Sequence, residues 1–377
     1  MTILFWFLAL AATVYYLCCM VAAWRFFSSP SPGHPAHWPP LSILIPLCGA
    51  DFRAYDNYKS FCGLDYPDFE IIFGVMDPRD SSVEVVDKLM TDFPEVPIRL
   101  VMGSDTIGEN PKVNNLHNML RAAKHEHLVI ADSDIRVGKG FLRDIARHLV
   151  QSGVGAVTCL YRAGEAPGLA ARLEALGITA EFAPSVFMAW MTEGVSFALG
   201  ATVATTRSQL TGIGGLHAIA DYLADDFMLG QLIWKSGAEV RIVPHVVDTI
   251  LGPMKLGELL RHQVRWGRGI RACRQKGHMG LLFTHGTVWA LMTMLLDGLS
   301  GASVALFSAV FSARIAMAWV VGCRFLGDGI LKRNLPLLPV RDCFNFLVWC
   351  LSLSGHRVTW RGKSYILMQD GTIVLAR

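Results

Sequence analysis

The sequence contains little charge. Asp, Glu, Lys and Arg make up 17% of its 377 residues, whereas a typical soluble domain has roughly 25%. The net charge is only +3, and binding to the phosphates of a nucleic acid needs a concentrated positive surface. The composition therefore argues against a nucleic-acid-binding protein.

Paired cysteine motifs and glycine-rich phosphate-binding motifs are also absent. The nine cysteines include no Cys-x-x-Cys pair, the spacing that zinc sites often show, so we expect buried free thiols. No Gly-x-Gly-x-x-Gly or P-loop motif follows the first predicted strand. This absence argues against the dinucleotide-binding and P-loop classes.

Long apolar runs account for much of the chain. Hydrophobic residues make up 52% of the sequence, and residues 1–27 carry no charge before Arg25. That length suits a membrane helix of about 20 residues. A cleaved signal peptide is the alternative, but the charged start and a clear small-residue cleavage site are missing. We therefore predict an uncleaved N-terminal transmembrane anchor.

A second apolar block follows the central part of the chain. Residues 280–323 are long enough for two transmembrane helices, hinged near Asp297. Lys and Arg are abundant in the central domain and also follow both apolar runs, so the positive-inside rule puts the domain and the tail in the cytoplasm. This orientation requires that residues 337–355 do not cross fully. We predict a re-entrant or interfacial helix there, in an integral membrane protein.

Residues 41–279 are predicted to form a globular α/β domain that ends in a basic amphipathic helix. A Pro-rich linker, residues 28–40, precedes it, and a β-type tail, residues 356–377, ends the chain. Strand and helix patterns alternate, which is typical of a mostly parallel sheet. Ligands of such sheets bind beyond the carboxyl ends of the strands. The predicted strands are 41–48, 69–77, 97–102, 127–132 and 154–160, and the predicted helices are 51–62, 82–91, 113–124 and 139–151.

Two of these strand ends carry carboxylates. Asp77 ends the second predicted strand, and Asp132 and Asp134 follow the fourth. A charge near the core is costly unless it is paired. Two carboxylates, completed by water or phosphate oxygens, suit Mg²⁺ or Mn²⁺. A helix cap or an Asx-turn is the alternative, but the position at strand ends favours a metal site.

Two further clusters carry possible chemistry. Asp225 and Asp226 begin an apolar-periodic helix, either as caps or as a general base that takes a proton from a hydroxyl. The basic helix places Arg261, Arg265 and Arg268 on one face. These arginines suit anionic lipid or a diphosphate.

Together, these motifs resemble inverting glycosyltransferases of the GT-A type, in families 2 and 21. The likeness is closest to ceramide glucosyltransferases and their bacterial relatives, including the hopanoid biosynthesis-associated glycosyltransferases, and it covers nearly the whole chain. It implies a GT-A nucleotide-diphospho-sugar transferase domain, with transmembrane helices at both ends, in the bacterial inner membrane. The motifs are ENPKVNNLHNML (109–120), ADSDIRV (131–137), LADDFM (223–228), RHQVRW (261–266) and VTWRGKSYILMQDGT (358–372).

The resemblance implies a role for each motif residue. Asp226 would be the catalytic base, supported by Asp225. Arg265 and Trp266 would form the signature beside the diphosphate, with catalytic roles. Metal binding would fall to Asp132 and Asp134. Contacts to the UDP-sugar would come from Asp77, Lys112, Asp132, Arg261 and His262.

Two positions depart from the family pattern. His262 stands where the last motif usually has Gln or Arg, which makes a processive polysaccharide synthase less favoured. Asp134 stands where some ceramide enzymes have Gly, which favours a metal site with two carboxylates.

The implied reaction moves a hexose, glucose or N-acetylglucosamine, from a UDP-sugar to a hydroxyl of a membrane lipid of the hopanoid or ceramide type. The apolar stretch 178–199, interrupted by Glu181, Pro184 and Glu193, is predicted to line the acceptor site or to lie at the interface. The alternatives are a processive polysaccharide synthase, a Mg²⁺-dependent phosphotransferase and an inactive membrane scaffold. No motif indicates an oligomeric state.

Overall fold

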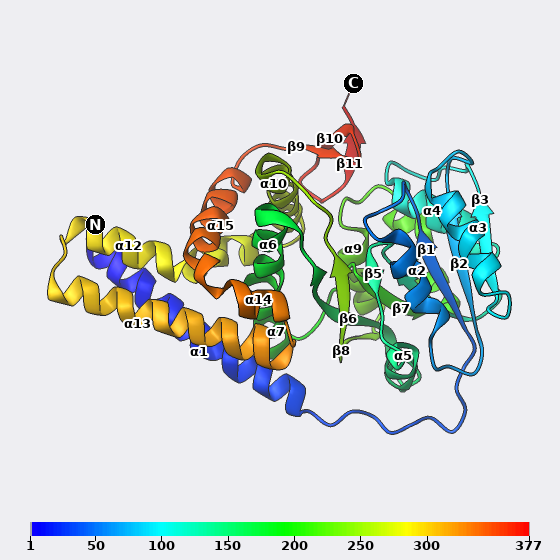
Figure 1. Ribbon diagram of the computed structural model, residues 1–377, viewed down its shortest axis with the longest axis horizontal. Coiled ribbons are helices and arrows are strands. Elements are labelled where there is room, and N and C mark those ends of the chain that lie inside the picture. Colours follow the sequence, from blue (N-terminus) through cyan, green and yellow to red (C-terminus); the bar gives the residue numbers. More distant parts are fainter. Residues whose placement is uncertain (1, 377) are drawn as a thin grey trace. The chain divides into compact units, whose positions relative to one another are not determined.

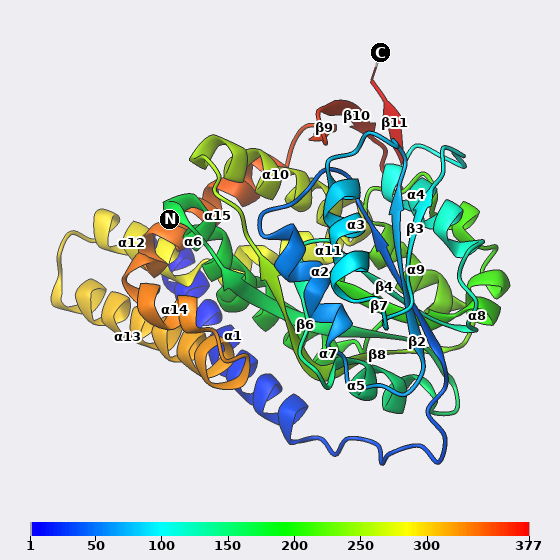
Figure 2. The same ribbon diagram turned by 45° about the vertical axis from the view of Figure 1, so that its right-hand side comes forward.

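The protein is described by a computed structural model over residues 2–376, and its chain forms two compact units (Figures 1 and 2). The sheet unit contains residues 30–164, residues 195–252 and the chain from residue 371. The helical unit contains the chain up to residue 29, residues 165–194 and residues 253–370.

The sheet unit is built on a mixed sheet whose first half is parallel. Within residues 2–376 this sheet has eight strands, in the order β3-β2-β1-β4-β7-β6-β8-β5. The pairings β1–β2, β2–β3 and β1–β4 are parallel, and β7 runs antiparallel to β4 and β6. The strands are β1 (Leu41–Pro46), β2 (Phe69–Val75), β3 (Ile98–Met102), β4 (His127–Ala131), β5 (Ile135–Arg136), β6 (Val154–Glu165), β7 (Thr202–Thr206) and β8 (Glu239–Ile250).

Both faces of the sheet are covered, so its central strands are apolar on both sides. Every residue of β1 is buried. Ile43 on one face belongs to a core with helices α2 (Ala54–Cys62), α3 (Ser82–Asp92) and α5 (Phe141–Leu149). Leu44 on the other face belongs to a core with α4 (Pro111–Leu120) and α9 (Asp225–Lys235). This arrangement confirms the predicted α/β fold and explains the unbroken apolar strands.

The strand order reverses beside β1. The chain runs outward from β1 through β2 to β3 and then returns to pair β4 with the other edge of β1. The carboxyl ends of β1 and β4 therefore flank a topological switch point, where sheets of this kind bind ligands. Residues 47–51 and 132–134 lie directly beyond these two ends.

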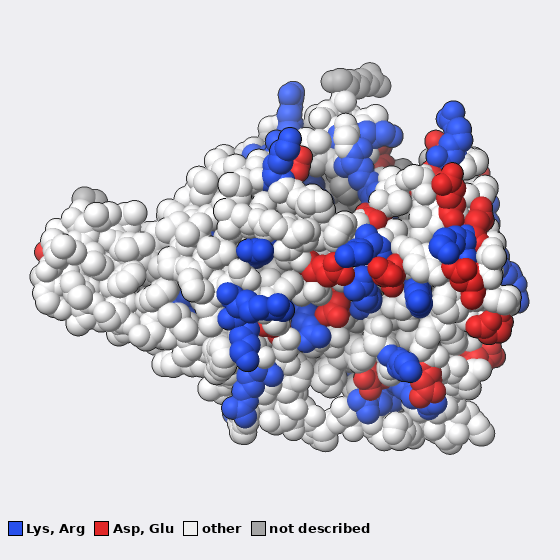
Figure 3. Space-filling view, in the orientation of Figure 1, with Lys and Arg blue, Asp and Glu red and all other residues white. Residues whose placement is uncertain are grey.

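The helical unit gathers the apolar segments. Helix α1 (Thr2–Ser28) packs against α7 (Ala183–Thr192), α12 (Gly286–Leu296) and α13 (Gly301–Ala318). The displayed face of α1, α12 and α13 is almost free of charged atoms (Figure 3). The other elements are α6 (Gly168–Gly177), η1 (Ile178–Phe182), α10 (Leu256–Cys273), α11 (Gln275–Gly280), η3 (Leu281–Thr284), η4 (Trp319–Phe325), α14 (Gly329–Asn334), η5 (Leu335–Leu337), α15 (Leu338–Ser352), β9 (Arg357–Trp360) and β10 (Lys363–Leu367).

Three helices in the described chain are long and apolar enough to cross a membrane, and a bent pair adds a fourth if it forms one span. The three are Thr2–Ser28, Gly301–Phe325 and Gly329–Ser352, and the bent pair is Gln275–Thr284 with Gly286–Leu296, at 51°. The predicted hinge near Asp297 lies between α12 and α13. The third helix covers most of residues 337–355, for which the re-entrant or interfacial assignment stays a prediction.

Candidate active site

The Asp-Ser-Asp turn lies at the switch point, fixed by hydrogen bonds from neighbouring strands. The Asp132 backbone N–H donates to the Ala201 carbonyl (3.2 Å), and the Asp134 carbonyl accepts from the Ile250 N–H (2.8 Å). Ser133 Oγ donates to Asp51 Oδ2 across 2.5 Å. This last bond ties the loop after β1 to the loop after β4, so the edges of the switch point are held together.

Three carboxylates crowd this turn. Burial and the nearby negative charges of Asp132 and Asp51 raise the pKa of Asp134 to about 7. Thr249 Oγ1 donates to Asp134 Oδ2 (2.9 Å) and partly offsets this effect. Such crowding of hard oxygen donors fits a divalent cation, which would relieve the repulsion.

No cluster of three or more His, Cys, Asp or Glu side chains suited to a metal occurs among residues 2–376. A cation on Asp132 and Asp134 would therefore complete its shell with oxygens from water or a phosphate ligand, as Mg²⁺ commonly does.

Lys112 neutralises part of the cluster from the start of α4. Its Nζ lies 2.7 Å from Asp132 Oδ1 and 3.6 Å from Asp225 Oδ2. Burial alone would lower the pKa of Lys112, but the charges of Asp132, Asp225 and Asp226 outweigh it and the net shift is upward. The ammonium group thus stays charged, and it links two of the predicted motifs.

Asn110 explains why α4 starts where it does. Its side-chain oxygen accepts from the backbone N–H groups of Lys112 and Val113 and so caps the helix, which begins at Pro111, two residues before the predicted start. Its Nδ2 donates to the Tyr222 carbonyl (2.8 Å) and to Asp225 Oδ1 (3.4 Å). One buried side chain therefore positions both Lys112 and the first turn of α9.

Asp225 and Asp226 have different surroundings. Asp225 is buried and faces Asn110 and Lys112. A Cβ on Gly200 would stand 2.8 Å from Asp226 Oδ2, so glycine there makes room for this carboxylate. Burial, followed by the charge of Asp225, raises the pKa of Asp226 to about 7, a value suited to a base at neutral pH.

Asp77 lies just beyond β2, at the same edge of the sheet, but outside the cluster. Its side chain is 58% exposed, and its Oδ1 accepts from the Arg79 backbone N–H (2.9 Å). This hydrogen bond holds the pKa of Asp77 below its usual range. Asp77 is therefore ionised and accessible, as a ligand-binding carboxylate must be.

The predicted signature of the helical unit lies on α10. The Arg265 guanidinium stacks over the Trp360 ring, 5.9 Å from its centroid. In the described chain it makes no ion pair within 4 Å and no hydrogen bond. Burial lowers the pKa of Arg265 to about 10, although Glu174 opposes the shift. An incompletely compensated arginine of this kind is suited to an anionic ligand.

Neighbouring residues of α10 have structural partners. His262 Nδ1 lies 3.0 Å from Glu174 Oε1, and its ring packs 4.6 Å from that of Trp266. Arg268 donates to the Ser354 carbonyl (3.1 Å) and the Arg357 carbonyl (2.6 Å). Arg268 thus holds the chain after α15, whereas Arg261 on the same helix is exposed.

Several of these contributors were not predicted from the sequence. Asp51, Gly200 and Thr249 in the sheet unit, and Glu174 in the helical unit, belong to no recognisable motif. Trp360 and Asn110 lie within the quoted motifs 358–372 and 109–120, but neither was given a role. Asn110 had a local signal, because Asn directly before Pro-Lys at a helix start is a common cap.

Comparison with known proteins gives these features a context. The sequence pattern of glycosyl transferase family 21 matches residues 4–373. Ceramide glucosyltransferase 1 of Caenorhabditis elegans is 26% identical over 208 residues, 55% of this chain and 44% of that protein. Ceramide glucosyltransferase 3 of the same organism is 26% identical over 229 residues, covering 60% and 50%. The chain thus spans about half the length of these relatives.

A solved structure supports the fold. A mannosyltransferase from Pyrobaculum calidifontis, in complex with GDP-Man and Mn²⁺, is 17% identical and aligns with a TM-score of 0.54. The alignment covers 93% of this chain and 99% of that one. At this identity the likeness concerns the fold, which is the predicted GT-A type.

Proposed function

The chain belongs to glycosyl transferase family 21, and from this membership we propose that it moves a hexose from a UDP-sugar to a hydroxyl of a membrane lipid of the ceramide or hopanoid type. The observation that carries the proposal is the cluster at the switch point, where Lys112 joins the Asp132 turn to the start of α9. The hexose is glucose or N-acetylglucosamine. The names of the relatives favour glucose and ceramide.

The proposed chemistry is a single displacement at the anomeric carbon. Asp226, as carboxylate, takes the proton of the acceptor hydroxyl. The acceptor oxygen forms its bond to the anomeric carbon as the bond from that carbon to the diphosphate oxygen breaks, and UDP leaves with the electron pair. No covalent sugar–enzyme bond is formed, so the configuration inverts.

The other residues of the cluster bind and orient. Asp132 and Asp134 would hold Mg²⁺ or Mn²⁺, which supplies positive charge for the diphosphate. Lys112 keeps Asp132 and Asp225 in place, and Asp77 is accessible for the uridine. The roles implied for Arg261, His262, Arg265 and Trp266 beside the nucleotide stay predictions.

Contacts within the helical unit support the proposed membrane location. Trp6 Nε1 donates to Asp297 Oδ2 (2.9 Å), so the start of α1 lies beside the turn between α12 and α13. Phe27 stacks on Phe325 (5.2 Å between centroids), so the other ends of α1 and α13–η4 also meet. We infer that α1 crosses the membrane and that α12 and α13 form a hairpin beside it.

The position of the tail supports a re-entrant or interfacial α15. Leu223 N–H donates to the Gly371 carbonyl (3.1 Å), and Ile373 N–H donates to the Asp221 carbonyl (2.7 Å), so the last residues belong to the sheet unit. A full crossing by α15 would separate them from it across the bilayer. We propose that α15 is re-entrant or interfacial, with the sheet unit and the tail in the cytoplasm of a bacterial inner membrane.

The test is sugar transfer by the purified protein. We expect radiolabel from UDP-glucose or UDP-N-acetylglucosamine to appear in a lipid extract as a single hexose on lipid, and Asp226→Asn to abolish it. Label in long polysaccharide would favour a processive synthase. Lipid extracts of a deletion strain and its parent, compared by mass spectrometry, would then identify the acceptor.

A further inference from the structure

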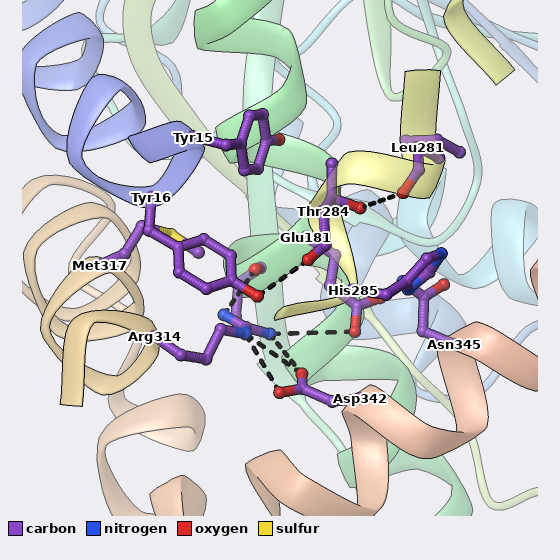
Figure 4. Close-up of a pocket in the computed structure, with 11 residues that line it drawn as sticks. Tyr15, Tyr16, Glu181, Leu281, Thr284, His285, Arg314, Met317, Asp342 and Asn345 are labelled. Atoms are coloured by element: carbon purple, nitrogen blue, oxygen red, sulfur yellow. Dashed lines mark hydrogen bonds and ion pairs between the residues drawn. The ribbon is translucent and has the colours of Figure 1, made fainter. Parts of the chain in front are cut away.

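The helical unit contains a polar pocket among apolar helices. It is lined by residues of α1, η1, η3, α13 and α15, and by His285, which directly precedes α12. Figure 4 shows the Tyr16 ring and the side chains of Arg314 and Asp342 directed toward one another across it. Polar groups between membrane helices are costly to maintain and usually mark a functional site. The residues used below are Tyr16, Glu181, His285, Arg314, Asp342 and Asn345.

The charges around the pocket balance. Arg314 forms a buried ion pair with Asp342 (Nη2–Oδ1 2.7 Å) and donates to the Ala180 carbonyl (2.9 Å). Arg341 pairs with Glu181 through Nη2 and Oε2 (2.5 Å). Two arginines therefore face two carboxylates. Adding a phosphate or an ammonium group would leave a buried charge uncompensated, so the pocket suits an uncharged polar ligand.

The pocket is built on a break in a candidate span. The bent pair changes direction by 51° at His285, between η3 and α12. Tyr16 OH donates to the Thr284 carbonyl (2.8 Å) and accepts from the Gly286 N–H (3.0 Å). One hydroxyl thus satisfies two backbone groups that the break exposes. Broken helices persist in membranes where they are buried in protein or line a cavity.

Two polar side chains at the pocket have no partner in the described chain. His285 is 4% exposed, and its Nε2 has no hydrogen-bond partner among residues 2–376. Its ring is held by Phe346 and Trp349, at 5.3 and 5.5 Å between centroids. The Asn345 amide, one turn after Asp342, makes no hydrogen bond within the same residues. The His285 nitrogen is a buried polar atom without a partner, which is costly, so a ligand that bonds to it gains affinity, and the partly exposed Asn345 amide is open to a second bond.

We propose that this pocket binds the uncharged, hydroxyl- and amide-bearing head of a membrane lipid, with hydrogen bonds to His285 and Asn345. The imidazole and the amide both match hydroxyl and amide groups, and the apolar helices around them match the acyl chains. The inference rests on the proposed function, because such a lipid is the class of acceptor that the reaction uses. It adds the residues that select the lipid.

The direct test is binding without nucleotide. A photoactivatable ceramide is cross-linked to the protein in nanodiscs, and the labelled peptides are identified by mass spectrometry. We expect labels on η1, η3 and α15, competed by unlabelled ceramide and not by phosphatidic acid. His285→Phe, which keeps the ring packing, and Asn345→Leu should each remove most of this labelling.

The matched control is His278→Phe. His278 is buried in the same bent pair and packs on Trp349, but it lines no part of the pocket. The His278→Phe variant also loses the hydrogen bond between His278 Nε2 and Ser352 Oγ (2.8 Å). The control should therefore lower thermal stability while it keeps the labelling.

Kinetics separate this inference from the reaction itself. His285→Phe should raise KM for ceramide about tenfold, the loss expected for one hydrogen bond, with KM for the UDP-sugar unchanged. Sugar transfer with labels outside the pocket, or labels unaffected by both substitutions, would overturn the lipid site and leave the enzyme intact. Labelling in the pocket without any sugar transfer would reject the proposed enzyme activity and retain the lipid site.

Discussion

Asp225 and Asp226 are neighbours in the chain, but their surroundings differ. Asp225 is engaged by Asn110 and Lys112, whereas Asp226 occupies the space beside Gly200. Asp226→Asn should fold and bind UDP-sugar but lose transfer by about 10²–10⁴-fold, as expected for a general base. Asp225→Asn should keep measurable activity. The measurements are kcat and KM for transfer, with UDP-sugar calorimetry as the control for binding. If Asp225→Asn lost transfer while Asp226→Asn kept it, the general base would be Asp225 and not Asp226.

The pH dependence follows from the raised pKa of Asp226, about 7. The base acts only as carboxylate, so kcat/KM should rise as pH increases through about 7. The charge of Asp225 contributes to this raised pKa. Asp225→Asn should therefore shift the acidic limb to lower pH, and a limb that stays in place would show that the two carboxylates are not coupled.

Gly200 offers a test that leaves every charged group in place. Its added Cβ would meet Asp226 Oδ2 at 2.8 Å, so Gly200→Ala must displace the end of this side chain. A misplacement of about 1 Å can lower turnover by roughly 10²-fold. Gly138→Ala is the control, since its Cβ would meet no atom within 4 Å. Equal kcat for the two variants would contradict the position given to Asp226.

The carboxylates of the Asp-Ser-Asp turn predict a metal requirement. Removal of the cation with EDTA should lower turnover by orders of magnitude, and Mn²⁺ or Mg²⁺ should restore it. Asp134→Asn removes one ligand and should raise the metal concentration needed for half-maximal activity. Full activity in EDTA would reject the metal assignment.

At the scale of elements, the strands with continuous apolar sequences were the easiest to predict. Strands β1 and β4 are almost completely buried and read as unbroken apolar runs. Strand β7 was missed because its buried threonines look polar, although Thr205 Oγ1 donates to the Gly155 carbonyl (2.7 Å). Strand β8 mixes buried and partly exposed positions without regular alternation and contains Pro244, so its sequence lacks a clear strand pattern.

The residues of the candidate site also fall into those that carry a local sequence motif and those that do not. Asp132, Asp134, Asp225 and Asp226 carry local motifs, so their sequence positions were enough to select them. Asp51 lies 82 residues before Ser133, its hydrogen-bond partner. Only the return of β4 to the edge of β1 brings such distant residues together, and no local pattern encodes that return.

Helix α15 supplies the prediction at this scale. Single cysteines are placed at Ser31, Leu299, Lys332 and Gln369, in a background without the exposed thiols Cys48 and Cys343. A membrane-impermeant maleimide added to intact cells should label only Leu299→Cys, and the other three should react after permeabilisation. Labelling of Gln369→Cys from outside would make α15 a full span.

At the scale of the whole molecule, the chain combines two kinds of solvent environment. The sheet unit follows the rules of a water-soluble α/β domain, with charged side chains at the carboxyl edge of its strands. In the helical unit, the buried arginines Arg314 and Arg341 are paired with Asp342 and Glu181. The low overall charge of 17% therefore reflects the apolar helices of this unit, three of which are long and apolar enough to cross a membrane.

The stereochemistry of the product tests the central claim most directly. The purified protein is incubated with an α-linked UDP-[¹³C]hexose and the acceptor lipid, and the anomeric configuration of the isolated glycolipid is measured by NMR. A single displacement with Asp226 as base predicts a β-linked hexose, absent from the Asp226→Asn reaction. An α-linked product, or the absence of any glycolipid from the reaction of the unmodified protein, would contradict the mechanism.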